Sequence, residues 1–165
     1  MKIVTTVEEM KSIAKTSTRG AVFTMGALHE GHRALIDHCR ELIGNNGQLV
    51  VTIFVNPTQF TNPNDLQTYP RTMESDIQLC EAAGVDYLFT PSVEEMYPTG
   101  ATLPTLSAGL LGTILEGASR RGHFDAVATV VHRLLDITSP DLTCFGEKDF
   151  QQLAVVRALV VQANI

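Results

Sequence analysis

The spacing of apolar residues divides the chain into predicted strands and helices. Residues 49–55 (LVVTIFV) are almost all apolar or β-branched, which is typical of a strand buried on both faces of a parallel sheet. In residues 29–44 the apolar positions recur at helical spacing, which predicts a helix with one apolar face. Thr6 and Glu9 form a capping-box pattern at the start of another helix. By the same criteria we predict strands at 20–25, 87–90 and 143–145, and helices at 7–15, 72–83, 123–137 and 149–162.

The alternation of strands and helices predicts an α/β fold. This order favours a Rossmann-like, doubly wound parallel sheet with helices on both faces. The polar segment 56–71 contains three prolines and is predicted to be a long loop, a kind of segment that is often functional. No repeat and no linker divides the sequence, so we treat residues 1–165 as one domain.

Composition narrows the classes of function. A hydrophobic content of 44% and a charged content of 18% are those of a globular protein. The formal net charge of −6 argues against a dedicated nucleic-acid binder, which normally has a basic face. Cys39, Cys80 and Cys144 are widely spaced and odd in number, so we expect reduced, buried thiols. The first residues lack a signal-peptide core and no apolar run could span a membrane, which predicts a cytoplasmic protein.

The first chemical motif, residues 24–32 (TMGALHEGH), stands at a predicted strand-to-helix junction. Gly26 and Gly31 let a ligand approach the backbone, and the unpaired N–H groups of a helix start favour phosphate. His29 and His32 project from the same side of the first turn, where two imidazoles can stabilise triphosphate oxygens. A zinc site is one alternative, but this HEGH spacing is one residue short of HExxH. Two surface histidines without a function are the other.

The second motif is residues 145–149 (FGEKD), after another predicted strand. Gly146 allows a tight turn, Lys148 is a mobile cation suited to phosphate, and Asp149 is an acceptor for a ribose hydroxyl or a helix N-cap. A solvated charged turn is the alternative. Both motifs lie at the carboxyl ends of strands, where open α/β sheets bind ligands.

A third group consists of amides, namely Asn56 and Gln59 in the long loop and Gln151 and Gln152 after the second motif. A tight ion pair would weaken a carboxylate that must act as a nucleophile. Neutral amides can orient such a carboxylate and can also bind hydroxyl groups of the same substrate. Polar loop residues are usually just solvated when taken alone, so a carboxylate ligand at these amides is inferred only together with the first two motifs.

Five blocks occur in a fixed order: TMGALHEGH, FVNPTQF, YPRT, EGASRRGHFD and FGEKDFQQL. Together they span residues 24–153 and resemble the pantoate–β-alanine ligase (pantothenate synthetase) family, one of the nucleotidyltransferases with a HIGH-type motif. The resemblance implies ATP-dependent condensation of (R)-pantoate with β-alanine. The reaction passes through pantoyl adenylate, releases pyrophosphate and AMP, and uses Mg²⁺ with the nucleotide.

The resemblance also implies a role for individual residues. His32 is the catalytic residue, as a proton donor or phosphate stabiliser. Gln59 and Gln152 bind pantoate, and Gln59 lies near β-alanine. Asp76, after YPRT, is the candidate near the metal. The residues implied to line the ATP site are Met25, Gly26, Ala27, Leu28, His29, Glu30, Gly31, His32, Gly146, Glu147, Lys148 and Asp149.

The main departure from the family is length. Family members continue with a second ATP loop containing Lys/Met-Ser-Ser-Arg and with a smaller C-terminal domain that closes over the site. Neither is found in the 165 residues. We therefore expect an N-terminal nucleotide- and pantoate-binding domain that is weakly active or inactive alone. The resemblance further implies a homodimer, with no nucleic-acid or membrane partner.

Two rival functions stay open. Another nucleotidyltransferase of the same type, acting on a phosphorylated substrate, would need more cations than Lys148 and a few arginines around the acceptor. A catalytically silent nucleotide- or tRNA-binding module is the second rival. His38 and His132 are interpreted as structural or surface residues, and for His123 a ligand role and a capping or packing role are left open.

Overall fold

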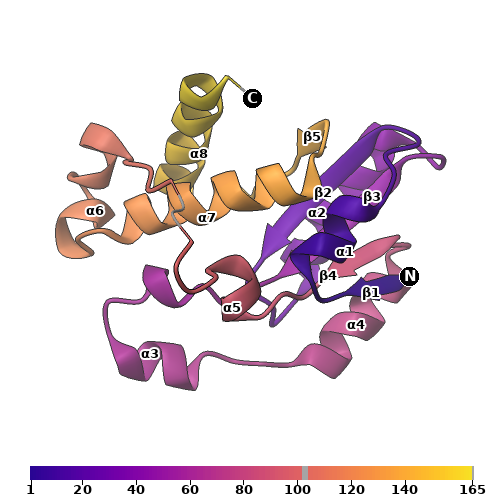
Figure 1. Ribbon diagram of the computed structural model, residues 1–165, viewed down its shortest axis with the longest axis horizontal. Helices are drawn as coiled ribbons and strands as arrows, with labels where there is room; N and C mark the ends of the chain where they lie inside the picture. The colour runs from indigo at the N-terminus through magenta and orange to yellow at the C-terminus, as the bar shows by residue number, and fades with distance from the viewer. Residues whose placement is uncertain (102–103, 165) are drawn as a thin grey trace.

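A five-stranded sheet, parallel at every pairing, runs through the molecule (Figure 1). The computed structural model describes residues 1–101 and 104–164. Within them the strand order is β1-β4-β3-β2-β5. The strands are β1 (Lys2–Val4), β2 (Arg19–Thr24), β3 (Gln48–Ile53), β4 (Tyr87–Phe89) and β5 (Leu142–Thr143). The predicted α/β fold with a parallel sheet is confirmed.

The order of the strands reverses at β2. From β2 the chain adds β3 and then β4 on one side, whereas β5 pairs with the other side of β2. Ala21 lies opposite Thr143 in this last pair, so the carboxyl ends of β2 and β5 lead into neighbouring loops. Open α/β sheets bind ligands at such a reversal.

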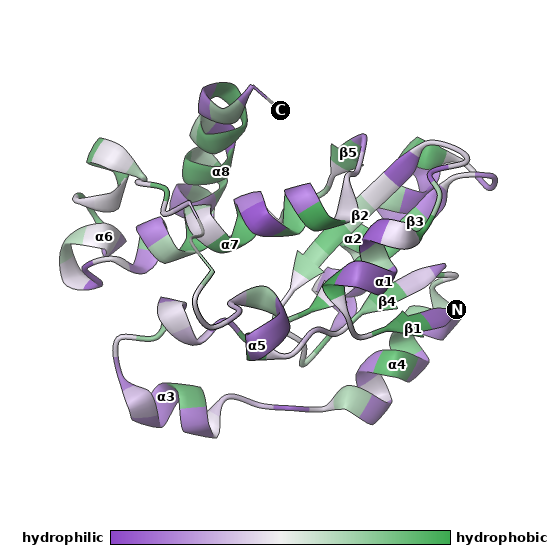
Figure 2. Ribbon diagram, in the orientation of Figure 1, coloured by the Kyte–Doolittle hydropathy of each residue, from purple (hydrophilic) through white to green (hydrophobic). Residues whose placement is uncertain are grey.

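Helices cover both faces of the sheet (Figure 1). Apolar residues of α2 and α4 pack on one face, and those of α1, α5 and α7 pack on the other, with α8 against α7. Figure 2 shows that α8 is hydrophobic along most of its length. The helices are α1 (Val7–Ser12), α2 (Glu30–Ile43), α3 (Pro63–Thr68), α4 (Met73–Ala82), α5 (Val93–Met96), α6 (Glu116–Ser119), α7 (His123–Thr138) and α8 (Phe150–Ala163), with 3₁₀ helices η1 (Pro57–Gln59) and η2 (Gly109–Gly112).

The segment 56–71 departs from the prediction of a loop, because it contains η1 and α3. Asn56 and Asn62 each cap a helix through the side-chain oxygen, and each precedes a proline at the first helical position. Proline has the backbone angle of a helix start, so two of the residues taken as loop signals begin helices here. Strand β1 was also missed, because only Val4 of its three residues is buried.

The three cysteines are free and buried, as predicted. Burial raises the pKa of Cys39 to about 12 and that of Cys80 to about 11, so both stay protonated. A Cβ atom on Gly20 would lie 2.5 Å from the Cys39 sulfur, which shows how closely α2 packs on β2. In the described part of the chain, no helix is long and apolar enough to cross a membrane.

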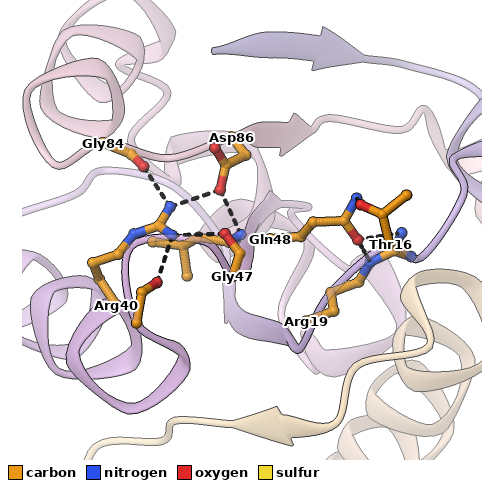
Figure 3. A network of polar contacts seen from close by, with 9 residues as sticks. Thr16, Arg19, Arg40, Gly47, Gln48, Gly84 and Asp86 are labelled. Atoms are coloured by element: carbon orange, nitrogen blue, oxygen red, sulfur yellow. Dashed lines mark hydrogen bonds and ion pairs between the residues drawn. The ribbon is translucent and has the colours of Figure 1, made fainter.

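A buried guanidinium closes the amino end of the sheet beside β2 and β3 (Figure 3). Arg19 is 3% exposed, and burial lowers its pKa. Its Nε and Nη2 atoms donate to Gln48 Oε1 at 3.1 and 3.0 Å, and Nη1 donates to the Thr138 carbonyl at 2.8 Å. The planar fork of arginine makes all of these bonds at once.

A second arginine secures the same end of the sheet (Figure 3). Arg40 of α2 donates to Asp86 Oδ2 at 2.6 Å and to the carbonyls of Gly84 and Gly47, both at 2.8 Å. Asp86 Oδ2 also accepts the backbone N–H of Leu49 at 2.7 Å, at the start of β3. These bonds hold α2 to the strands at the end opposite the two motifs.

Replacing Arg19 with Lys will lower the free energy of unfolding by about 2 kcal/mol, because an ammonium group cannot replace the divergent hydrogen bonds of the fork. Urea unfolding followed by circular dichroism measures the change. The matched control is Arg157→Lys at an exposed position of α8, which will leave the unfolding midpoint unchanged. Equal midpoints for Arg19→Lys and Arg157→Lys would show that the buried fork adds nothing.

Candidate active site

The loop between β2 and α2 has an unusual backbone. Gly26 and Ala27 are consecutive left-handed residues, with φ of +83° and +51°. The N–H groups of Ala27 and Leu28 donate to Asp76 Oδ2 and Oδ1, at 2.9 and 2.8 Å. Successive N–H groups in such a turn form a concave anion site, and here the anion is a carboxylate of the protein itself. Asp76, on α4, is 2% exposed.

The two histidines of the first motif cap α2 reciprocally. His29 Nδ1 accepts the N–H of Gly31 at 3.1 Å, and His32 Nδ1 accepts the N–H of His29 at 3.3 Å. A backbone N–H is always the donor, so both Nδ1 atoms are acceptors and each neutral ring carries its proton on Nε2. The ring centroids lie 4.2 Å apart. The capping pair therefore leaves two Nε2–H donors available for a ligand.

The backbone N–H groups of this loop are not available in the way that the sequence suggested. Gly26 donates to Thr24 Oγ1 at 3.2 Å, and the four groups described above are also engaged. The prediction that unpaired N–H groups of this loop receive phosphate is thus wrong for Gly26, Ala27, Leu28, His29 and Gly31. The side-chain groups that can donate a hydrogen bond to an anion here are the imidazoles of His29 and His32.

The second motif lies beside the first. Phe23 and Phe145 stack edge to face with centroids 6.1 Å apart, and a Cβ atom on Gly146 would lie 3.8 Å from Leu35 of α2. Lys148 is close enough to lower the pKa of His32. These contacts bring the two motifs together at one end of the sheet, as predicted.

His32 is held in its neutral form. Burial is the main cause that lowers its pKa, followed by the neighbouring His29 and then Lys148, whereas the Asp76 carboxylate acts in the opposite direction. Protonation at Nδ1 would also break the bond from the His29 N–H. A neutral Nε2–H donor suits an oxyanion that gains charge during a reaction.

Charged groups of the second motif are exposed. The side chain of Lys148 is 93% exposed and that of Asp149 is 61% exposed, with 3.7 Å between Nζ and Oδ1. Asp149 is the N-cap residue of α8, but its side chain makes no capping hydrogen bond. Both groups can therefore reach a ligand that lies over this end of the sheet.

The amides of the long segment form a buried chain. Asn56 is fully buried, and its Oδ1 accepts the hydroxyls of Tyr97 and Thr58 at 3.0 and 2.9 Å. Its Nδ2 donates to Gln59 Oε1 at 3.0 Å. This bond fixes the orientation of the Gln59 amide, and Gln59 is itself buried. The Asn56 side chain thus bonds within the protein and holds Gln59 in place.

His123 fixes the same segment from α7. Its Nδ1 lies 2.9 Å from the carbonyl oxygen of Gln59, so Nδ1 carries the proton. The ring is buried, and burial lowers its pKa. Of the roles left open for His123, the burial of the ring and its bond to Gln59 support packing, and no observation here tests a ligand role. Its place in the EGASRRGHFD block was the only sequence signal for it.

The two glutamines after the second motif differ. Gln151 donates to the carbonyls of Leu111 and Ile114 at 2.7 and 2.8 Å and accepts the N–H of Glu116. It is therefore a structural residue. Gln152 is half-buried on α8, and no hydrogen bond joins its amide to any part of the chain that the structure describes. Helix α7 packs against both η1 and α8, the elements that carry Gln59 and Gln152.

No metal cage is formed by the described residues, since no group of three or more His, Cys, Asp or Glu side chains could hold an ion. Asp76, the candidate near the metal, is buried, and it also accepts the Thr72 hydroxyl at 3.0 Å. Its role at a metal stays a prediction. Magnesium usually binds through few carboxylates together with the phosphates of a substrate.

Acid will destabilise the chain through His32 and His123. Both folded pKa values lie below the ordinary value of about 6.5, so the unfolded imidazoles bind protons first as the pH falls. The two neutral imidazoles make their full contribution to stability when the pH is above the ordinary pKa of about 6.5. This contribution is lost as the pH falls from that value to the lower pKa of the folded state. Melting temperatures between pH 7.5 and 5 test this. In His123→Gln the melting temperature will change less with pH than in the unaltered chain, whereas the exposed His38→Gln variant will behave like the unaltered chain. Equal pH dependence of the melting temperature in the two variants would refute this prediction.

Comparison with known proteins identifies the family. The sequence matches the pantoate-beta-alanine ligase family model over residues 2–165. It is 48% identical over 159 residues to a pantothenate synthetase of Streptomyces avermitilis, covering 96% of this chain and 48% of that protein. The chain thus spans about half the length of such curated relatives, including a second pantothenate synthetase from Streptomyces coelicolor.

Solved structures give the same result. The pantothenate synthetase of Thermus thermophilus superposes with a TM-score of 0.90 at 46% identity, covering 99% of this chain and 58% of that one. The pantoate-beta-alanine ligase of Francisella tularensis, complexed with beta-gamma ATP and beta-alanine, gives a TM-score of 0.91 at 43% identity, covering 100% of this chain and 64% of that one. The family match runs over nearly the whole sequence and the fold agrees, so the chain belongs to the pantoate–β-alanine ligase family.

Proposed function

We propose that this chain is the nucleotide- and pantoate-binding domain of an enzyme that joins (R)-pantoate to β-alanine with ATP. The observation that carries the proposal is the capping pair of His29 and His32, whose Nε2–H donors lie at the reversal of the sheet, beside Lys148. Family membership and the ATP analogue and β-alanine bound in the Francisella tularensis relative support it.

In the first step a carboxylate oxygen of pantoate attacks the α-phosphorus of ATP. The bond to the bridging oxygen breaks, and its electron pair leaves with pyrophosphate. His32 donates a hydrogen bond from Nε2 to the phosphate oxygens as their negative charge grows. The exposed Lys148 side chain moves with the phosphates and stays close to them. Magnesium would neutralise phosphate charge when it is bound with the nucleotide.

Gln59 gives the site its preference for a carboxylic acid. Its N–H₂ group can hold an oxygen of pantoate without the ion pair that would weaken the nucleophile, and Asn56 fixes the orientation of the amide. We assign Gln152 to the same substrate. In the second step the amine of β-alanine attacks the acyl carbon of the mixed anhydride formed in the first step, AMP leaves with the electron pair of the bond between the acyl carbon and the phosphate oxygen, and the amine proton passes to solvent.

Further predicted roles belong to this proposal. The ATP-facing residues are those of the two motifs, residues 25–32 and 146–149. A homodimer and a cytoplasmic location stay predictions from the family and from the sequence.

The second half found in the relatives would supply the lid and the second ATP loop. The rival that acts on a phosphorylated substrate would require a cationic acceptor site, whereas Gln59 bonds to the neutral Asn56 amide, and the neighbouring Arg120 guanidinium is paired with Glu116 and donates to the Gln59 carbonyl.

His32→Ala in the full-length ligase that carries this domain will slow adenylate formation by roughly 10²-fold, the usual cost of losing an oxyanion donor. Pyrophosphate release with ATP and pantoate measures the rate, and circular dichroism verifies folding. His38→Ala, at an exposed position on the same helix, is the matched control and will retain the full rate. A His32→Ala enzyme as fast as this control would rule out the phosphate role.

The 165-residue chain will bind ATP and pantoate but form almost no pantothenate. Its own groups contact both ligands, whereas an adenylate without a lid is exposed to water and hydrolyses before β-alanine can attack. Calorimetric titration with ATP, pantoate and RNA measures binding, and pantothenate yield is compared with that of the full-length ligase. Equal yields would show that the chain holds the complete site. RNA binding without pantoate binding would favour the tRNA-binding rival.

A further inference from the structure

One buried carboxylate receives three hydrogen bonds under the β2–α2 loop. The N–H groups of Ala27 and Leu28 reach the two oxygens of Asp76, and the Thr72 hydroxyl reaches Oδ1 at 3.0 Å. Asp76 lies 49 residues from Ala27 along the chain, on α4. The carboxylate therefore joins a distant helix to the loop that leads into the capping pair.

Gly26 allows this carboxylate to approach. A Cβ atom on Gly26 would lie 3.1 Å from Asp76 Oδ2 and 3.0 Å from Ile53 Cγ2. The loop thus rests directly on the carboxylate and on the end of β3. Ala27, a residue with a side chain, holds a positive φ that costs free energy. Two hydrogen bonds to a charged group offset that cost, because such bonds are stronger than neutral ones.

The carboxylate also decides where an external anion can bind. Asp76 fills the concave site that the two N–H groups form, so a phosphate cannot enter it. Beyond the loop, the imidazoles engage the N–H groups of His29 and Gly31, and the Glu30 N–H lies between them at the start of α2. A phosphate at this end of the sheet is therefore directed to that helix start, to the Nε2–H donors and to Lys148.

We propose that Asp76 is a positioning residue for adenylate formation, which holds Gly26 and Ala27 in the left-handed conformation that places His29 and His32 against the α-phosphate. The inference rests on the proposed function, and it differs from a metal-binding role for Asp76. A carboxylate that turned away from the loop toward a metal would leave the part-buried N–H groups of Ala27 and Leu28 without their present partner, at a cost in stability.

Asp76→Asn tests the proposal with two measurements. Asparagine keeps the size of the side chain but has one acceptor oxygen, so its amide N–H₂ group faces one of the two loop N–H groups. In the 165-residue chain, hydrogen exchange at Ala27 and Leu28 will become at least about tenfold faster, the scale of one lost bond to a charged group, while Val50 in β3 stays protected.

In the full-length ligase, Asp76→Asn will lower kcat for pyrophosphate release by at least about tenfold, on the same scale, with little change in the KM for pantoate. The matched control is Asp37→Asn on α2, whose exposed carboxylate pairs only with Arg33 among the ion pairs of the described residues. This control will retain wild-type values in both measurements.

Thr72→Val is the milder second variant. It removes the hydroxyl that donates to Asp76 Oδ1 and keeps the carboxylate, so it will give a smaller loss of kcat and a smaller gain in exchange at Leu28. If Asp76→Asn does not fold, this variant decides the question. Wild-type kcat in Thr72→Val would then overturn the proposal.

The other possible results also test the proposal. Fast exchange at Ala27 and Leu28 together with a wild-type kcat in Asp76→Asn would overturn the proposal. So would rescue of Asp76→Asn by excess Mg²⁺, which would make Asp76 a metal ligand. If the wild-type ligase releases no pyrophosphate, the proposed function fails instead. Hydrogen exchange would still show whether the carboxylate holds the loop.

Discussion

The site depends on a single buried anion placed beneath a loop. The Asp76 carboxylate takes the N–H groups of Ala27 and Leu28, and it thereby fixes the turn from which α2 starts. Without those bonds, two part-buried N–H donors would lose their partner, and the positive φ of Ala27 would be uncompensated. The capping pair of His29 and His32 begins directly after this turn. The direction of its imidazoles therefore depends on a residue from another helix.

The two ends of the sheet have different chemistry. At the amino end, Arg19 and Arg40 make internal hydrogen bonds that hold helices and strands together (Figure 3). At the carboxyl end, Lys148 and Asp149 are exposed, and the order of the strands reverses. Cations that stabilise the fold are thus kept apart from the cation that can meet a ligand. Because Lys148 takes no part in the bonds at the amino end, its exposed side chain can move to contact a nucleotide.

Much of this arrangement could be predicted from the sequence, because it follows from local pattern. The run at 49–55 predicted β3, and the two motifs were placed correctly at the ends of β2 and β5. The contacts that position the site could not be predicted. Asp76 reaches Leu28 across 48 residues, and His123 reaches Gln59 across 64. No periodicity encodes such pairs. The N–H groups of Ala27 and Leu28 were misjudged for the same reason, since their partner was a distant carboxylate, whereas those of Gly26, His29 and Gly31 bond to side chains of the motif itself.

The uncharged character of the donors explains how one site can serve both an anionic nucleophile and a nucleotide. Burial keeps His32 neutral, and Asn56 fixes the orientation of the Gln59 amide. Both groups donate hydrogen bonds without placing a full positive charge beside a carboxylate. Positive charge comes from Lys148, which is long, exposed and mobile enough to stay with the phosphates. Charge is thus supplied where phosphate oxygens become more negative, and it is kept away from the oxygen that must attack. Under the proposed function, the cation beside Gln59 is also engaged within the chain, because the Arg120 guanidinium pairs with Glu116 at 2.6 Å and donates to the Gln59 carbonyl.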